Sequence, residues 1–142
     1  MDVRNVLMHL QCELVAERAV VNPLDISWLQ YDVLMQLERE VHMLPSELSS
    51  IMGVSRTKLS KALKGLKMMG YVCQTPSKVD GRELCTSITE SGRNLLKNIS
   101  LQHTSLYEIA IASMTTDELD AFACLCEKFS TGLKRQRLAR HE

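Results

Sequence analysis

Long apolar runs are absent from this sequence, and so are the compositional features of disordered chains. No apolar stretch approaches the ~18 residues that a membrane-spanning helix needs, and residues 1–13 mix apolar with charged and polar side chains. Only three prolines and six glycines occur among 142 residues, and 45% of the residues are hydrophobic, which disfavours disorder. We therefore expect one folded domain over residues 1–142, located in the cytoplasm and without a membrane partner.

Paired cysteines and metal-ligand spacings are also missing. The five cysteines are odd in number and show neither a disulfide-framework spacing nor a Cys-x2-Cys pair, so reduced thiols are expected. His9, His42 and His103 are scattered along the chain, so a metal site would require convergence in space. No nucleophile motif or phosphate-binding loop is present. These absences predict a protein that is not an enzyme and that holds no metal or other cofactor.

The charges balance over the whole chain but not locally. Lysine plus arginine and aspartate plus glutamate each number 17. Residues 55–82, however, hold seven lysines and arginines against a single aspartate, a net charge of +6 over 28 residues, so the rest of the chain carries −6. A molecule with this charge separation can present a basic face to phosphate groups although its net charge is zero.

Hydrophobic periodicity predicts a mainly helical chain with one β-hairpin. Helices are expected over residues 3–21, 28–40, 45–52, 55–69, 90–111 and from 116 into the basic residues 134–140, and strands over 71–75 and 83–88. Pro45 suits the first turn of its helix, Gly53 ends that helix by taking a positive φ, and Ser55 caps the next helix. Thr115 and Glu118 have the spacing of a capping box.

The order helix, turn, basic helix and charged hairpin is that of a winged helix-turn-helix. The expected fold class is mainly α with a small β-hairpin wing (α+β), with a DNA-binding core over residues 25–89. The helices in residues 1–22 and 90–142 are too apolar for one small core, so we expect them to be dimerisation helices that pack against a second copy. A two-fold dimer would place its two recognition helices about 34–36 Å apart, which is one turn of DNA.

The basic helix and the hairpin carry the candidate contacts to double-stranded DNA. The expected DNA-binding residues are Ser55, Arg56, Thr57, Lys58, Ser60, Lys61, Lys64, Lys78 and Arg82. Residues 57–61 fall in the first two turns of the helix, which face base edges in a helix-turn-helix, and their ammonium and hydroxyl groups can bind there. Arg56, Lys64 and Lys67 are expected at phosphates. The alternative for the whole set is an ordinary solvated helix face.

The turn of the hairpin is expected to reach beyond the major groove. Arg82 is placed to enter a minor groove, because narrow AT-rich stretches attract arginine. Asp80 is expected to support the wing by orienting Arg82, since phosphate would repel its carboxylate. Asp80 could also be a simple Asp-Gly turn residue. Lys78 is expected to contact the DNA backbone.

Three motifs resemble those of the MarR family of winged-helix regulators. Residues 54–61 look like the start of that family's recognition helix, and residues 70–72 look like its turn into the first wing strand. The third motif is Asp80-Gly81-Arg82 followed by Ile88-Thr89 and Gly92, which resembles the family's wing signature. The order of the flanking helices matches the family across nearly the whole chain.

This resemblance implies a homodimeric transcriptional regulator that binds a pseudo-palindromic operator. Members of the family are usually repressors that release DNA when a small molecule, an oxidant or a metal binds. Two departures affect the expected contacts. Gln74 stands where the family often has an arginine, which removes one possible phosphate contact. Lys64-Gly65 stands where the family often has an Asp-Arg pair, and a glycine inside a helix costs about 1 kcal/mol relative to alanine.

The resemblance also implies a site for the signal. Some members place a reactive cysteine in the first helix near tyrosines of the second, and the ligand cavity usually lies where the dimer helices meet the winged domain. The corresponding candidates here are His9, Cys12, Trp28 and Tyr31. Small-molecule release and oxidation of Cys12 both remain open, and so does a semi-buried thiol without a redox role.

Two further alternatives follow from the residues. Cys73 and Cys85 lie on the two predicted strands, so they could be cross-strand neighbours that form a reversible disulfide in the wing. The winged helix could also contact protein rather than DNA, and the +6 segment disfavours that alternative.

Overall fold

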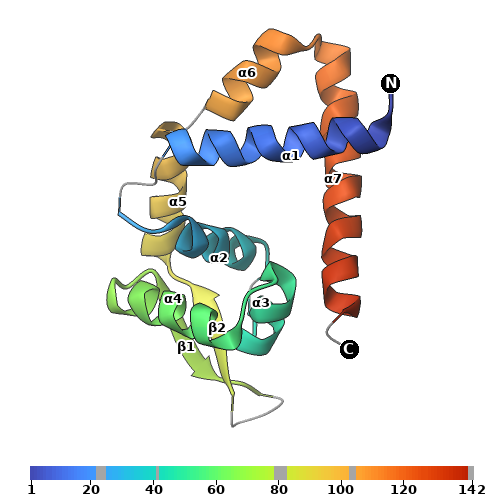
Figure 1. The fold of residues 1–142 in the computed structure, drawn as a ribbon. Coiled ribbons are helices and arrows are strands. Elements are labelled where there is room, and N and C mark those ends of the chain that lie inside the picture. Colours follow the sequence, from blue (N-terminus) through green and yellow to red (C-terminus); the bar gives the residue numbers. More distant parts are fainter. Residues whose placement is uncertain (22–24, 41, 79–82, 103–104, 141–142) are drawn as a thin grey trace.

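The computed structural model describes residues 1–21, 25–40, 42–78, 83–102 and 105–140 (Figure 1). Within these ranges the chain forms seven helices and one two-stranded hairpin. They are α1 (Val3–Val20), α2 (Trp28–Arg39), α3 (Pro45–Met52), α4 (Arg56–Met68), β1 (Val72–Pro76), β2 (Leu84–Ile88), α5 (Glu90–Gln102), α6 (Ser105–Ser113) and α7 (Thr116–Ala139). The predicted mainly helical fold with a hairpin wing is confirmed.

Capping side chains set the helix boundaries. Ser27 and Gln30 form a capping box at the start of α2, and Thr115 and Glu118 form another at the start of α7. Gly53 ends α3 with φ 66°, a left-handed conformation that glycine adopts without steric cost. These boundaries agree with those expected from the sequence at Gly53 and Thr115.

The hairpin is antiparallel, and its register relates the two cysteines of its strands. Cys73 pairs with Ser87, and Cys85 pairs with Thr75, so the two cysteines are not directly opposite each other. They are diagonal neighbours across the two strands, and a reversible disulfide between them stays a prediction. The five cysteines are free thiols.

A further backbone pair anchors the hairpin to the segment before α3. Met43 N–H donates to the carbonyl of Thr86 at 3.0 Å, and Thr86 N–H donates back at 2.7 Å. Thr86 is fully buried, so this pair joins the base of the wing to the core.

The hydrophobic core lies in the winged unit, which we define as α2 to α5 together with the hairpin. It is formed by side chains from α2 to α5 and from the hairpin, among them Val33, Leu34, Leu37, Leu48, Ile51, Leu59, Leu63, Leu66, Val72, Ile88, Leu96 and Ile99. Burial of this apolar surface is the main stabilising contribution to the unit. It fixes the inner face of α4 and leaves the opposite face exposed.

One predicted helix is two helices. The apolar residues from 95 to 111 predicted a single long helix, whereas the structure has α5 and α6 with different directions (Figure 1). The apolar spacing continues through both helices, so it gave no indication of where the first one ends. Residues 103–104 lie outside the described residues.

The flanking helices have unpartnered apolar surface. Neither α1, α6 nor α7 has a buried residue, and in Figure 1 they form an open frame beside the winged unit. Their exposed apolar side chains include Val6, Leu10, Leu14, Leu106, Ile109, Ile111, Phe122, Leu125, Phe129 and Leu133. Arg137 of α7 donates a hydrogen bond to the carbonyl of Ile51 and so holds α7 against α3. Among the described residues, none of the helices has the length and apolar character to cross a bilayer.

Candidate nucleic-acid interface and ligand cavity

The fourth helix presents two chemically different faces. Its inner face consists of the buried residues Leu59, Ala62, Leu63 and Leu66. Its outer face carries the exposed residues Arg56, Thr57, Lys58, Ser60, Lys61, Lys64 and Lys67 and contains no acidic residue. Because the inner face is packed into the core, the basic residues and the hydroxyl groups are held on one rigid exposed ridge.

The turn before α4 is fixed by side-chain hydrogen bonds. Ser55 Oγ accepts from the backbone N–H of Lys58 at 3.1 Å, which confirms Ser55 as the N-cap. Ser49 Oγ donates to the carbonyl of Val54 at 2.6 Å, which links α3 to the turn. The exposed start of α4 is therefore set by its own cap as well as by the core.

Arg56 has a partner that the sequence did not reveal. Its guanidinium lies 3.6 Å from the Glu83 carboxylate, directly before β2 at the turn end of the hairpin, and both side chains are partly exposed. This pair joins the first turn of α4 to the hairpin. Arg56 was expected to meet phosphate, and the structure shows that such a contact would compete with Glu83. The two residues are 27 positions apart, so no local spacing could have indicated the pair.

The tip of the hairpin is described only in part. Lys78 follows β1 and is exposed. Asp80 and Arg82 lie outside the described residues, so their expected roles in the wing stay predictions. At the turn end of the strands, Ser77 N–H donates to the carbonyl of Glu83 at 3.0 Å and closes the described part of the hairpin.

A shallow groove runs beside α4. Its volume is about 210 Å³, and it is lined by Pro45, Ser60, Leu63, Lys64, Lys67 and Gln74. Gln74 Nε2 donates to Thr86 Oγ1 at 3.2 Å, so this amide satisfies a buried hydroxyl within the hairpin. Lys64 and Lys67 therefore border this groove. Gln74, which stands where the MarR family often has an arginine, is hydrogen-bonded within the hairpin.

A larger cavity lies where α1, α2, α5 and α6 meet. Its volume is about 610 Å³, and it is lined by Leu14, Glu17, Arg18, Val21, Trp28, Tyr31, Ile99, Ser100, Ser105, Leu106 and Tyr107. Trp28 and Tyr31, both expected from the sequence as candidates for the signal site, lie in this wall. His9 and Cys12 lie on exposed positions of α1 and are not among the described lining residues.

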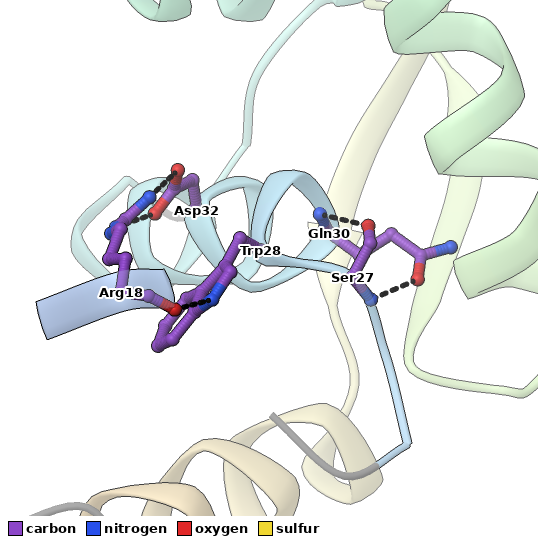
Figure 2. A network of polar contacts seen from close by, with 5 residues as sticks. All are labelled: Arg18, Ser27, Trp28, Gln30 and Asp32. Carbon is purple, nitrogen blue, oxygen red and sulfur yellow. Dashed lines mark hydrogen bonds and ion pairs between the residues drawn. The ribbon is translucent and has the colours of Figure 1, made fainter. Parts of the chain in front are cut away.

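Arg18 organises the wall of this cavity. Its guanidinium donates to both carboxylate oxygens of Asp32, at 2.9 and 2.6 Å, and lies 4.7 Å above the Trp28 ring (Figure 2). The Trp28 indole N–H donates to the Arg18 carbonyl at 2.9 Å. Trp28 and Tyr31 meet edge to face with their ring centroids 5.3 Å apart. The consecutive helices α1 and α2 are thus joined by a bidentate ion pair, a hydrogen bond and a cation–π contact.

Two groups of the wall have shifted pKa values. The hydrogen bonds to Asp32 raise the pKa of the Arg18 guanidinium above its ordinary value. Burial raises the pKa of the Tyr31 phenol. Arg18 is therefore a permanent cation and Tyr31 a neutral hydroxyl at physiological pH. Arg18 and Asp32 were not expected from the sequence, because residues 14 positions apart on different helices share no periodic signal.

Comparison with known proteins supports both the fold and its class. A family model described as "MarR family" matches residues 24–83. The transcriptional repressor MprA of Escherichia coli K12 is 31% identical over 115 residues, covering 78% of this chain and 65% of that protein. The regulator PapX of Escherichia coli is 24% identical over 95 residues, covering 67% of this chain and 58% of PapX. This chain thus spans less than two thirds of the length of either relative.

Solved structures show the same fold over almost the whole chain. A MarR protein from Peptoclostridium difficile superposes with a TM-score of 0.74 at 21% identity, covering 98% of this chain and 93% of that one. FabT of Streptococcus pneumoniae, solved in complex with DNA, gives 0.69 at 18% identity, with 95% and 99% covered. A mutant MarR from Escherichia coli complexed with operator DNA gives 0.62 at 22% identity, with 91% and 99% covered.

Proposed function

Because this chain belongs to the MarR family, we propose that it is a transcriptional regulator that binds double-stranded DNA in a sequence-specific manner. The observation that carries the proposal is the outer face of α4, where lysines and hydroxyl groups are exposed and no acid is present. An α-helix fits the major groove of B-DNA, and this one is held by a core that buries its opposite face.

Individual contacts follow from position along α4. Thr57, Lys58, Ser60 and Lys61 lie in its first two turns and read base edges, because a recognition helix points its N-terminal turns at the bases. Lys64 lies farther along and meets phosphate. Ser55, already engaged as the cap, contributes by fixing the start of the helix.

The hairpin supplies flanking contacts. Lys78 meets the DNA backbone, and Arg82, oriented by Asp80, enters the minor groove. Arg56 meets phosphate when it exchanges its carboxylate partner Glu83 for DNA. Base contacts specify the sequence, whereas these phosphate contacts fix orientation and contribute affinity.

The assembly we propose is a homodimer. The DNA-binding core, residues 25–89, contacts DNA, while residues 1–22 and 90–142 hold the two copies together. Support comes from the exposed apolar side chains of α1, α6 and α7, which form a surface that an isolated protomer leaves in water. A second copy related by a two-fold axis would bury this surface. The dimer would then present two α4 helices, one to each half of a pseudo-palindromic site.

Regulation is proposed to be repression that a small molecule relieves. The relative MprA is named a transcriptional repressor, and the cavity beside Trp28 offers about 610 Å³, the size of a drug-like ligand site. The proposed location is the cytoplasm, where such a protein meets DNA. An oxidative signal at Cys12 is the alternative, and it would act outside the described cavity wall, because this exposed thiol does not line the cavity.

Selection from a random-sequence duplex pool tests the proposal. The purified protein should enrich one motif with dyad symmetry, whose half-sites are centred about 10 base pairs apart. Denatured protein is the control for retention by the support. Enrichment of no motif, with equal recovery of all sequences, would refute sequence-specific binding and leave the protein-interaction alternative.

A further inference from the structure

Gln30 makes contacts in two directions from the first turn of α2. Its Oε1 accepts from the backbone N–H of Ser27 at 3.0 Å, and Ser27 Oγ accepts from the backbone N–H of Gln30 at 3.1 Å, which closes the capping box (Figure 2). Its Nε2 donates a long hydrogen bond, 3.4 Å, to the carbonyl of Ala62 in the middle of α4. One side chain therefore completes the cap of α2 and touches the backbone of the recognition helix.

Gly65 provides the space for this contact. A Cβ atom built at Gly65 would lie 2.7 Å from Gln30 Nε2, closer than real Cβ contacts. Glycine in the interior of a helix is unfavourable relative to alanine, so its presence in α4 calls for a local reason. The atom that a Cβ would meet is the end of the Gln30 side chain, so a methyl group at Gly65 would displace the amide from α4 and not the backbone.

The same turn of α2 forms part of the cavity wall. Trp28 lies two residues before Gln30, lines the cavity and donates to the Arg18 carbonyl at 2.9 Å. Asp32, two residues after Gln30, holds the Arg18 guanidinium. A displacement of this turn would therefore move the cavity wall and the Gln30 amide together (Figure 2).

We propose that Gln30 is a positioning residue that sets the placement of α4 against the first turn of α2 and couples that placement to the cavity wall. The inference rests on the proposed DNA-binding function and assigns a regulatory contact to it. Occupancy of the cavity acts on Trp28 and Arg18, the first turn of α2 shifts, and Gln30 carries the shift to the backbone of α4 at Ala62 and Gly65. Gln30 itself touches no DNA.

The first test separates the two contacts of Gln30. Gln30→Glu keeps a cap acceptor at the third position of the box but replaces the donor to Ala62 with a carboxylate that the carbonyl repels. Ser27→Ala is the matched control, since it weakens the same cap and leaves the Gln30 amide in place. Each variant is titrated with the duplex that the wild type selects from a random pool and with the unselected pool itself.

Gln30→Glu should lower affinity for the selected duplex roughly ten-fold, the size expected when one base contact is misplaced, and change affinity for the unselected pool less than about two-fold. Ser27→Ala should lower the melting temperature and keep the ratio of the two affinities. Equal loss on both DNAs, or an unchanged ratio in Gln30→Glu, would overturn the inference. A wild type that selects no duplex would overturn the proposed function as well.

A second test covers the case in which Gln30→Glu does not fold. Gly65→Ala raises helix propensity and so favours folding, but its methyl group displaces the Gln30 amide. We expect Gly65→Ala and Gln30→Ala each to weaken selected-duplex binding, and the double variant to be no weaker than the worse single variant. Additive losses, or a Gly65→Ala protein with wild-type affinity, would contradict the proposed contact.

Fluorescence tests the coupling to the cavity. Trp28 is the only tryptophan of the chain, so its emission reports on the first turn of α2. Binding of the selected duplex should change this emission in the wild type, and Gln30→Glu should lose most of the change at saturating DNA. If the emission of the wild type does not respond to DNA, the link between α4 and the cavity wall is wrong.

Discussion

At the scale of single residues, the cations of α4 differ in whether they already form an ion pair within the protein. Lys61 is an exposed residue of the second turn, whereas Arg56 lies 3.6 Å from the Glu83 carboxylate. Among the described residues no ion pair involves Lys61, so its ammonium can meet a base edge without leaving a carboxylate, while Arg56 must exchange one anionic partner for another. Lys61 is therefore expected to contribute to recognition of the bases, whereas the phosphate contact of Arg56 is offset by the loss of its ion pair with Glu83.

Replacing Lys61 should weaken specific recognition. Lys61→Ala is expected to cost ~1–3 kcal/mol on the selected duplex if the ammonium reads a base, and much less on random DNA. Lys97→Ala on the exposed surface of α5 is the matched control and should retain affinity. Fluorescence anisotropy with both duplexes measures the difference. An unchanged affinity in Lys61→Ala would show that this residue does not contact a base.

Removing the carboxylate that holds Arg56 should strengthen binding to any duplex. Glu83→Gln frees the guanidinium for a phosphate and removes a negative charge beside the DNA, so the plot of log K against log salt should steepen by about 0.9 per protomer. Stability should change by less than about 1 kcal/mol, because the pair is partly exposed. Glu13→Gln on α1 is the control. A shallower slope in Glu83→Gln would contradict the role assigned to Arg56.

At the scale of elements, local sequence signals determined most helix ends. Ser55 and Thr115 cap their helices as expected, and Gly53 ends α3 with a positive φ. The signals failed where the outcome depends on packing between distant segments. The apolar spacing through residues 95–111 is continuous, yet α5 and α6 are separate helices. The contact of Gln30 with Gly65 also joins residues 35 positions apart, so the sequence showed only an unexplained glycine.

Two glycines of helical segments should respond in opposite ways to alanine. A Cβ at Gly92 would lie 2.4 Å from the Tyr71 carbonyl oxygen and 2.7 Å from a side-chain carbon of Ile88, whereas nothing lies within 4 Å at Gly132. Gly92→Ala should therefore destabilise the protein by about 1–3 kcal/mol through forced displacement of the strand start. Gly132→Ala should stabilise it by up to about 1 kcal/mol.

Urea unfolding followed by circular dichroism measures both changes at once. The two variants carry the same substitution, so the difference between them isolates the packing at α5. If Gly92→Ala were as stable as the wild type, the close approach of α5 to residue 71 would be wrong.

At the scale of the whole molecule, charge and apolar surface are segregated. The +6 of residues 55–82 lies on the winged unit, while α1, α6 and α7 carry exposed apolar side chains such as Phe122 and Phe129. The sequence indicated this segregation, because both the charge run and the surplus of apolar helices are local in the chain. The family resemblance implied a cavity at this junction with Trp28 and Tyr31 as candidates, but the sequence could not indicate the Arg18–Asp32 pair that joins α1 to α2 beside it.

A charge placed on the apolar surface should break the dimer. Phe122→Asp on α7 is expected to convert a dimer into a monomer of 16.1 kDa, because burying an unpaired carboxylate opposes association. Ser130→Asp adds the same charge at an exposed polar position of the same helix and is the control. Light scattering coupled to gel filtration gives the masses. A wild-type protein with the mass of a monomer would contradict the proposed two-fold dimer.

The central claim is that the acid-free face of α4 binds DNA phosphates and bases. The salt dependence of duplex binding by the wild-type protein tests it most directly, because each neutralised phosphate contributes about −0.9 to the slope of log K against log salt. With five or more phosphates contacted, we expect a linear plot with a slope steeper than about −4. A slope between zero and about −1, or no binding at low salt, would contradict the claim.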